Sequence, residues 1–267
     1  MAVASNSWSL KLARNGSIVA VTSGGPHAWI MINALRARFG DFPVIVEEGE
    51  SSDVFWRRRR KLLGPMKVAS MQAARIPIRL TKPRTDVVIQ EMIETQGLQP
   101  DPPQGLEMIH VPSINSDTTR DALKTLNPAA VFVVSTRMIG TRTLNAVSAP
   151  FINYHSGINP AYRGMYGGYF ALAEDAPEHF GATVHLVDEG VDTGDILYQS
   201  HLEADVRDNF HTYLWRLAAG SRNIVIAAME DALNGTLSPR HVDLPSRQYF
   251  SPTLGGYLWT GLSKGVW

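Results

Sequence analysis

The sequence contains no cysteine, which excludes disulfide bonds, thiolate ligands for a metal and a cysteine nucleophile. It also lacks long apolar runs. Ala129–Val134 and Ile224–Ala228 are far shorter than the ~20 residues that a membrane-spanning helix needs. Residues 1–16 precede the first predicted strand, and we interpret them as a leader. They contain no continuous apolar stretch and do not have the pattern of a signal peptide. We therefore expect a cytoplasmic protein with no membrane partner.

An excess of charge of one sign is missing as well. Lys plus Arg and Asp plus Glu both number 25, so the formal net charge is zero. No overall field then draws the chain toward nucleic acid, and we expect no nucleic-acid partner. With 267 residues, 44% of them hydrophobic, the chain is long enough to bury a substantial core. Length alone allows one large domain or two modest ones.

The first half begins with a strand, a tight turn, a helix and a second strand. Residues 17–22 are apolar and β-branched, a glycine turn follows, residues 28–39 have helical apolar spacing, and residues 42–46 are apolar again. This βαβ order predicts an α/β, Rossmann-like, mostly parallel sheet with helices on both faces. Further strands are predicted over 106–111, 129–135, 150–154, 181–187 and 196–200, and helices over 117–126 and 210–233.

Two segments depart from this alternation. Residues from about 53 to 96 are basic and helical in pattern, with prolines that predict two or three helices and the turns between them. The last segment, residues 238–267, is rich in proline, glycine and aromatic residues, and we expect it to pack on the core or on a second copy in a homodimer. The expected organisation is therefore one α/β domain over residues 17–237, with a helical insertion and a C-terminal extension.

Polar side chains cluster where the strand predicted over residues 150–154 ends. Asn153 and His155 are two residues apart, so their side chains point to the same face at the carboxyl edge, where ligands bind in open α/β sheets. The acidic loop 188–195 can bring a carboxylate to His155. Such a trio suits acyl transfer to an amine, because the amide and an imidazolium stabilise an oxyanion while the carboxylate keeps the ring charged and accepts a proton.

Three motifs extend this pattern: N-x-H-x-x-x-x-P-x-Y-R-G at 153–164, G-x-T-V-H at 181–185 and V-D-x-G-V-D-T-G-D-I-L at 187–197. In this order they resemble the catalytic half of the 10-formyltetrahydrofolate-dependent formyltransferases. The resemblance implies the formyltransferase fold and formyl transfer from this folate through a tetrahedral intermediate, with no metal. It matches Asn153, His155 and Asp192 to the family's catalytic residues. Asp192 is preferred over Asp188 and Asp195 because it precedes a Thr-Gly pair.

The same resemblance implies binding residues. Backbone groups on one side of the pterin pocket would come from Arg137, Met138, Ile139 and Gly140, and the other side from Val187, Asp188, Gly190 and Val191. For the substrate we predict the turn at Gly24 and Gly25, which can hold an anion through backbone N–H groups, together with His27, Tyr162, Arg163 and His185. Bracing of loops and packing in the core are the alternatives for the last three.

The acceptor is expected to be a primary amine of a small metabolite that can also carry phosphate. An amino group on a nucleotide-linked sugar fits the basic insertion and the aromatic extension. Glycinamide ribonucleotide is disfavoured because Pro26-His27 replaces the Ser-Asn that follows the family's glycine turn. Methionyl-tRNA fits least, since those enzymes resemble the chain only in their catalytic domain. Hydrolysis of the folate and a non-catalytic folate-binding module remain as alternatives.

Overall fold

A computed structural model describes residues 17–82 and 85–267, so the predicted leader lies outside the described residues. Seven strands form one sheet in the order β3-β2-β1-β4-β5-β7-β8. The first five run parallel, and β7 and β8 are antiparallel to their neighbours. The predicted α/β, mostly parallel sheet is therefore confirmed. The strands are β1 Ile18–Thr22, β2 Val44–Glu47, β3 Met108–Val111, β4 Ala130–Val134, β5 Phe151–His155, β7 Gly181–Leu186 and β8 Ile196–His201.

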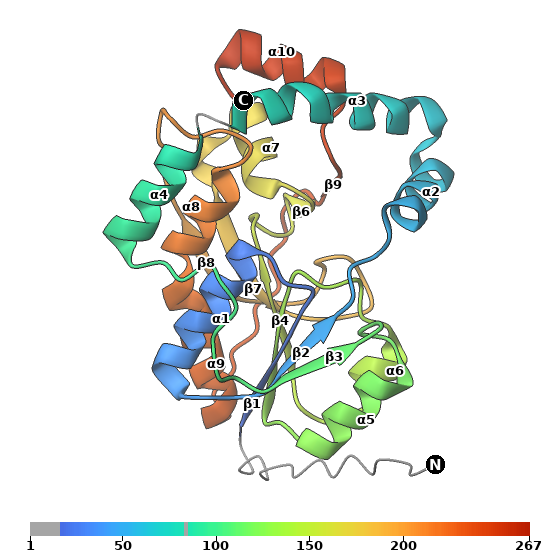
Figure 1. The fold of residues 1–267 in the computed structure, drawn as a ribbon, viewed down its shortest axis with the longest axis vertical. Coiled ribbons are helices and arrows are strands. Elements are labelled where there is room, and N and C mark those ends of the chain that lie inside the picture. The colour runs from blue at the N-terminus through green and yellow to red at the C-terminus, as the bar shows by residue number, and fades with distance from the viewer. Residues whose placement is uncertain (1–16, 83–84) are drawn as a thin grey trace, which may run out of the picture.

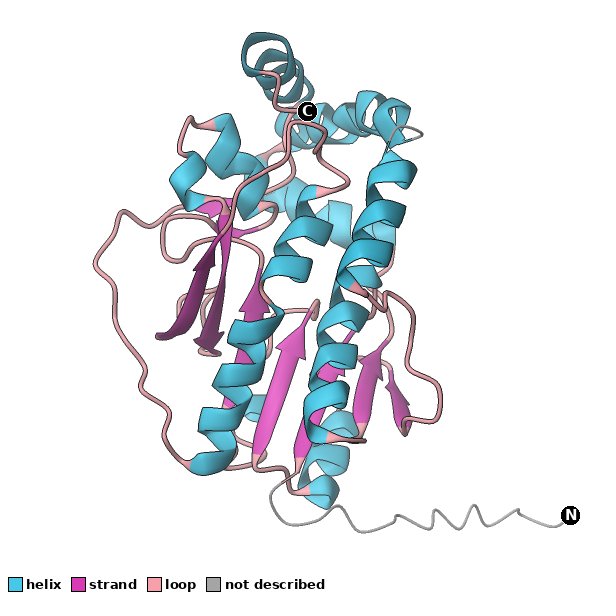
Figure 2. Ribbon diagram, turned by 90° about the vertical axis from the view of Figure 1, so that its left-hand side faces the viewer, coloured by secondary structure: helices cyan, strands magenta, loops and turns pink. Residues whose placement is uncertain are grey.

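Helices cover both faces of this sheet (Figures 1 and 2). Alternate residues of each buried strand supply the two cores: in β1, Ile18 and Ala20 face one side, and Val19 and Val21 face the other. The larger core lies under α1 Pro26–Phe39, α4 Thr85–Gln96, α8 Tyr213–Gly220 and α9 Arg222–Asn234. The smaller core lies under α5 Asp117–Leu126 and α6 Thr141–Leu144.

The basic segment forms α2 Ser52–Leu63, α3 Pro65–Thr81 and α4. Gly64, with φ +83°, ends α2 and precedes α3. Pro77 is one of the prolines expected to mark turns between the helices of this segment, and for this residue the expectation is wrong, since it lies inside α3. Packing explains this, because the neighbouring Ala74 and Ile78 are buried in a core cluster and α3 also packs against α10 Leu254–Lys264. The last helix of the segment, α4, belongs to the main core through its buried Val88 and Met92.

The single helix predicted over residues 210–233 is wrong, because α8 and α9 separate at Ser221. This serine is fully buried, and its hydroxyl lies 2.7 Å from the hydroxyl of Ser200 on β8. Ser221 also departs from helical geometry, with φ −110° and ψ 7°. The buried hydroxyl pair thus fixes the position of the break, which helical spacing alone did not reveal.

Short elements missed in the sequence tie the C-terminal extension to the domain. β6 Arg163–Gly164 pairs in parallel with β9 Gln248–Tyr249, and α7 Gly167–Ala173 follows β6. Tyr257 of α10 is fully buried, while Trp259 is exposed. The extension therefore returns to the carboxyl edge of the sheet before it ends beside α3. In the described part of the chain, no helix has the length and apolar character needed to cross a membrane.

Candidate active site

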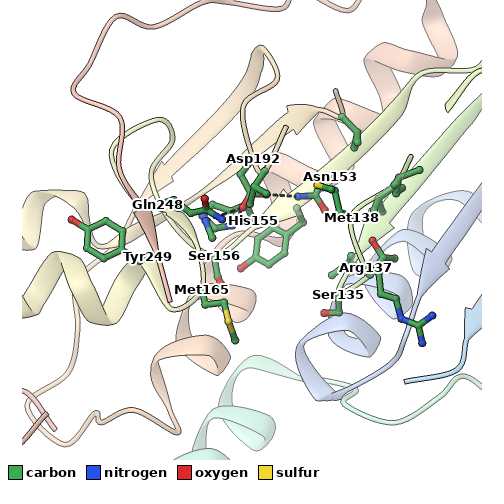
Figure 3. Close-up of a pocket in the computed structure, with 18 of the residues that line it drawn as sticks. Ser135, Arg137, Met138, Asn153, His155, Ser156, Met165, Asp192, Gln248 and Tyr249 are labelled. Carbon is green, nitrogen blue, oxygen red and sulfur yellow. Dashed lines mark hydrogen bonds and ion pairs between the residues drawn. The ribbon is translucent and has the colours of Figure 1, made fainter. Parts of the chain in front are cut away.

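A cavity of about 710 Å³, called the main cavity below, opens at the carboxyl ends of the parallel strands (Figure 3). Strand order reverses between β1 and β4, which is where open α/β sheets form a ligand crevice. The cavity is lined by Ser23 after β1, by 135–139 after β4, by 153–156 at the end of β5, and by most of the loop 187–192. The topology alone thus places three strand ends around one site.

Asp192 is the centre of a polar cluster in the main cavity. Its Oδ1 accepts a hydrogen bond from Nδ2 of Asn153 at 3.3 Å and lies 3.4 Å from Nε2 of His185. Its Oδ2 lies 3.5 Å from Nδ1 of His155. Figure 3 shows Asn153, His155 and Asp192 close together, with a dashed line between Asn153 and Asp192. The structure therefore brings the three predicted catalytic residues together.

The ring of His155 is held from its far side. Its Nε2 lies 2.8 Å from the carbonyl oxygen of Tyr162, in a buried contact. A carbonyl only accepts, so Nε2 carries the hydrogen and Nδ1 faces the carboxylate of Asp192. A neutral ring would turn a lone pair toward this negative charge, whereas a proton on Nδ1 completes an ion pair. The geometry therefore suits an imidazolium that supports a developing negative charge.

The carboxylate of Asp192 is held in its ionised form. Burial alone would raise the pKa of Asp192, but the positive charge of His155 opposes this, and the backbone N–H of Gly164 donates to Oδ2 at 2.9 Å. The balance keeps the pKa well below the usual range of an aspartate. Asp192 also has φ +51°, a left-handed conformation that Asp and Asn tolerate better than most residues.

Asn153 is oriented by a neighbour on the adjacent strand. It lies directly opposite His185 in the β5–β7 ladder, and its Nδ2 is 3.1 Å from Nε2 of that ring. Nδ1 of His185 donates to the carbonyl of Leu186 at 2.7 Å, so Nε2 of a neutral ring accepts from the amide. Both hydrogens of the Asn153 amide thus have acceptors, but at the long distances of 3.1 Å to His185 and 3.3 Å to Asp192. An oxygen that gains negative charge is a stronger acceptor and can take over one of them.

We therefore expect His185 to act as a positioning residue, and two substitutions test this. We expect His185→Ala to lower kcat about 10-fold, because the Asn153 amide loses an acceptor that fixes its orientation. His185→Gln places an amide oxygen near the position of Nε2 and should restore most of that loss. Steady-state kinetics with varied folate check the prediction. Equal losses in both variants, or a change confined to KM, would contradict a positioning role.

The segment after β4 is anchored by a carboxylate that sequence reasoning missed. Glu47, 2% exposed at the end of β2, accepts from the backbone N–H of Arg137 at 2.6 Å and of Ile114 at 2.9 Å. The Arg137 side chain contacts Glu47, Glu48 and Pro112, and Figure 3 shows it directed away from Asp192. The signal in the sequence that could have identified Glu47 is an acidic residue directly after an apolar strand.

The predicted binding residues divide into two groups. Those on the main cavity are His27, His185, Arg137, Met138, Ile139, Val187, Asp188, Gly190 and Val191. Those outside its lining are Gly24, Gly25, Gly140, Tyr162 and Arg163.

Residues of the second group have structural contacts. Tyr162 is buried and stacks on Tyr249 with ring centroids 5.3 Å apart. Arg163 donates to Ser246 at 2.8 Å and to the carbonyl of Val191 at 2.7 Å, so it braces the loop that carries Asp192. In the structure both side chains are thus held by protein groups, and the direct substrate contacts predicted for Tyr162 and Arg163 stay predictions.

His27 is the exception in the predicted anion-binding turn, because it reaches the main cavity. Its Nε2 lies 2.6 Å from the hydroxyl of Ser135, and burial lowers the pKa of His27. The neighbouring Gly24 and Gly25 have φ values of +86° and +101°, so they shape the turn that leads into α1.

Other lining residues come from distant segments that no local pattern marked. Phe55, Arg58 and Arg59 of α2 reach the main cavity, as do Met165 and the stretch 248–250 of the extension. Among residues 17–82 and 85–267, no group of three or more His, Asp or Glu side chains is arranged to hold a metal ion.

Comparison with known proteins identifies relatives of this chain. The family profile described as "Formyl transferase" matches residues 71–229, which is more than half of the sequence. A methionyl-tRNA formyltransferase from Anaeromyxobacter dehalogenans is 31% identical over 141 residues, covering 52% of the chain and 45% of that protein. The chain thus spans less than half the length of this curated relative.

Solved structures share the fold at low sequence identity. A sugar N-formyltransferase from Shewanella sp. superposes with a TM-score of 0.55 and 15% identity, covering 87% of the chain and 76% of that protein. The phosphoribosylglycinamide formyltransferase from Bacillus halodurans gives a TM-score of 0.52 and 17% identity, covering 81% and 95%. At these identities the likeness concerns the fold alone.

Proposed function

Because the chain belongs to the formyl transferase family, we propose that it moves a formyl group from 10-formyltetrahydrofolate to a primary amine. The observation that carries this proposal is the cluster around Asp192, whose carboxylate contacts Asn153, His155 and His185 in the main cavity. An amide donor, an imidazole and a buried carboxylate at one strand edge suit attack on a carbonyl without a covalent enzyme intermediate.

In the proposed reaction the amine nitrogen attacks the formyl carbon. A new carbon–nitrogen bond forms to the acceptor and the bond to N10 of the folate breaks, while one proton leaves the amine and one arrives at N10. Asn153 donates to the formyl oxygen while it carries negative charge, and the positive charge of the His155 ring, whose two N–H groups face Tyr162 and Asp192, stabilises it electrostatically. The carboxylate of Asp192 lies 3.5 Å from Nδ1 of the His155 ring, and its lowered pKa keeps it negatively charged there. None of these steps needs a nucleophilic side chain.

The pterin end of the folate fits the segment after β4. Glu47 and Asn115 occupy the N–H of Arg137, the carbonyl of Met138 and the N–H of Gly140. The N–H groups of Met138 and Ile139 have no hydrogen-bond partner within residues 17–82 and 85–267. We assign these groups, together with the loop over residues 187–191, to the folate. A flat heterocycle with donors and acceptors along its edge would satisfy them.

For the acceptor we propose an amine on a nucleotide-linked sugar. The names of the relatives suggest two other candidates, glycinamide ribonucleotide and methionyl-tRNA. The side chains from α2 and the extension enlarge the main cavity beyond the catalytic cluster. Their aromatic and basic character suits a phosphate-bearing acceptor that has a ring system. We place the catalytic domain over residues 17–237 and the extension over 238–267.

Turnover assays with the purified chain test this function. We expect tetrahydrofolate to accumulate from 10-formyltetrahydrofolate only when an amine acceptor is present, with the product heavier by one formyl group in mass spectra. The panel contains aminosugar nucleotides, glycinamide ribonucleotide and methionyl-tRNA. Equal folate consumption without an acceptor would identify a hydrolase. Folate binding without turnover across the panel would identify a binding module.

A further inference from the structure

A second cavity of about 550 Å³, called the side cavity below, adjoins the main cavity. The two share lining residues, among them Glu50, Phe55, Met165 and Tyr166, so they form one continuous depression. The side cavity lies between α2 and α3 and the start of α8. In Figure 1, α2 and α3 lie beyond the carboxyl ends of the strands. The residues of α2 fall outside the segment that the family profile matches.

The helices around the side cavity carry charge of one sign. Residues 54–82 contain nine Lys or Arg and no Asp or Glu, although the whole chain is electrically balanced. Arg75 and Arg79 of this segment line the side cavity, whose lining includes one carboxylate, Glu50. That carboxylate pairs with Arg58 at 2.8 Å. The cavity therefore presents positive charge that the surrounding side chains leave largely uncompensated.

Arg59 lines the main cavity and contacts Phe55 and Met165, two residues that the main and side cavities share. Its guanidinium carbon lies 5.0 Å from the ring centroid of Phe55 and 4.5 Å from that of Phe250, and its Nη2 lies 3.3 Å from Sδ of Met165. Burial lowers the pKa of Arg59, although Glu50 opposes this shift. It forms no ion pair with a carboxylate within the described residues. A guanidinium fixed between two rings and facing a cavity is preorganised to bind an anion.

Aromatic rings complete the side cavity. Phe210 and Tyr166 lie on its wall with ring centroids 4.4 Å apart, and Phe55 is shared with the main cavity. His211 donates from Nε2 to the carbonyl of Ile78 at 2.7 Å, which leaves Nδ1 for other partners. Flat apolar surfaces beside basic side chains suit a heteroaromatic base joined to phosphate. An acceptor with these groups fits better than a simple amino acid or sugar.

We propose that the side cavity binds the nucleoside diphosphate part of the acceptor, with the base against its aromatic rings and the diphosphate on Arg59, which lines the adjoining main cavity. This assignment rests on the proposed function, because it places the acceptor's amine in the main cavity beside Asn153. The main cavity has to hold the formyl end of the folate and the amine together, so the remainder of the acceptor extends past Arg59. Arg75 and Arg79 then attract the same anion from α3.

Binding of free nucleotides tests the assignment without any turnover. Titration calorimetry with UDP, dTDP, GDP and inorganic pyrophosphate, with and without saturating tetrahydrofolate, measures Kd for the wild type and two variants. We expect at least one nucleoside diphosphate to bind, and Arg59→Met to weaken it about 10- to 100-fold. Arg57→Met is the matched control, since this exposed arginine of the same helix lines neither cavity. It should change Kd less than about twofold.

The outcomes separate this inference from the proposed function. Absence of nucleotide binding in both conditions, or equal losses in the two variants, would overturn the inference even if formyl transfer is observed. Diphosphate binding that depends on Arg59, without formyl transfer to any amine, would support the proposed diphosphate site and reject the proposed formyl transfer. Thermal unfolding of each variant shows whether a loss of binding reflects a loss of folded protein. Arg59→Lys, which keeps the charge but not the fork of donors, is expected to fall between wild type and Arg59→Met.

Discussion

Asp192→Asn is expected to lower kcat about 100-fold or more with a much smaller change in the KM for the folate. The substitution keeps the shape of the side chain and its Oδ1 acceptor, and asparagine tolerates the left-handed conformation at φ +51°. What disappears is the negative charge that faces Nδ1 of His155 at 3.5 Å. The ring then no longer has a carboxylate to hold a proton on the atom nearest the site.

Asp195→Asn provides the control for this variant. Asp195 lies three residues further along the chain and is exposed, and its side chain lies 3.6 Å from Nδ1 of His241. Its loss should leave kcat within about a factor of two. If Asp192→Asn retained turnover within about threefold of wild type, the catalytic assignment would be wrong.

The lowered pKa of Asp192 also predicts how the free energy of unfolding depends on pH, and this can be measured. A carboxyl whose pKa is depressed on folding stabilises the protein above its unfolded value of about 4, and this contribution is lost as pH falls through the folded pKa. The unfolding free energy of Asp192→Asn should therefore vary less with pH on the acid side than that of wild type. Because a low pKa makes a weak proton acceptor, the electrostatic role of Asp192 is favoured over collection of the amine's proton.

Much of the fold followed from local patterns in the sequence. Apolar β-branched runs marked the strands, and the order of strands and helices implied the parallel sheet. The break at Ser221 could not be predicted in this way, because it depends on a hydroxyl partner on β8. The pairing of β6 with β9 joins segments about 85 residues apart and is only two residues long, so it leaves almost no periodic signal.

The candidate site was predictable to a similar extent. Strand period two placed Asn153 and His155 on one face, and the resemblance to the formyltransferase motif singled out Asp192. The contact of His185 with Asn153 required the register of β5 against β7, which the sequence does not state. Arg59 and Phe250 reach the same depression from α2 and the extension, and their approach depends on how these distant segments pack. Residues that choose the acceptor were therefore harder to predict than residues that perform the transfer.

Gly157 shows how the backbone supports the chemistry. A Cβ atom at this position would lie 2.5 Å from the carbonyl oxygen of Tyr162, 2.6 Å from Nε2 of His155 and 3.1 Å from the Cα of Gly167. The first two atoms are the partners of the 2.8 Å hydrogen bond that fixes the imidazole. Neither can yield freely, because the carbonyl belongs to the backbone and the ring is buried.

Gly157→Ala is therefore expected to lower kcat at least ~10-fold and to reduce the free energy of unfolding by about 1–3 kcal/mol. Displacement of the His155 ring separates Nδ1 from Asp192, so activity should fall further than stability alone explains. Denaturant titration and steady-state kinetics of the same preparation measure both effects. Gly255→Ala is the control, because nothing lies within 4 Å of its added Cβ on α10. A Gly157→Ala variant with wild-type kcat would show that the bond between His155 and Tyr162 does not matter for turnover.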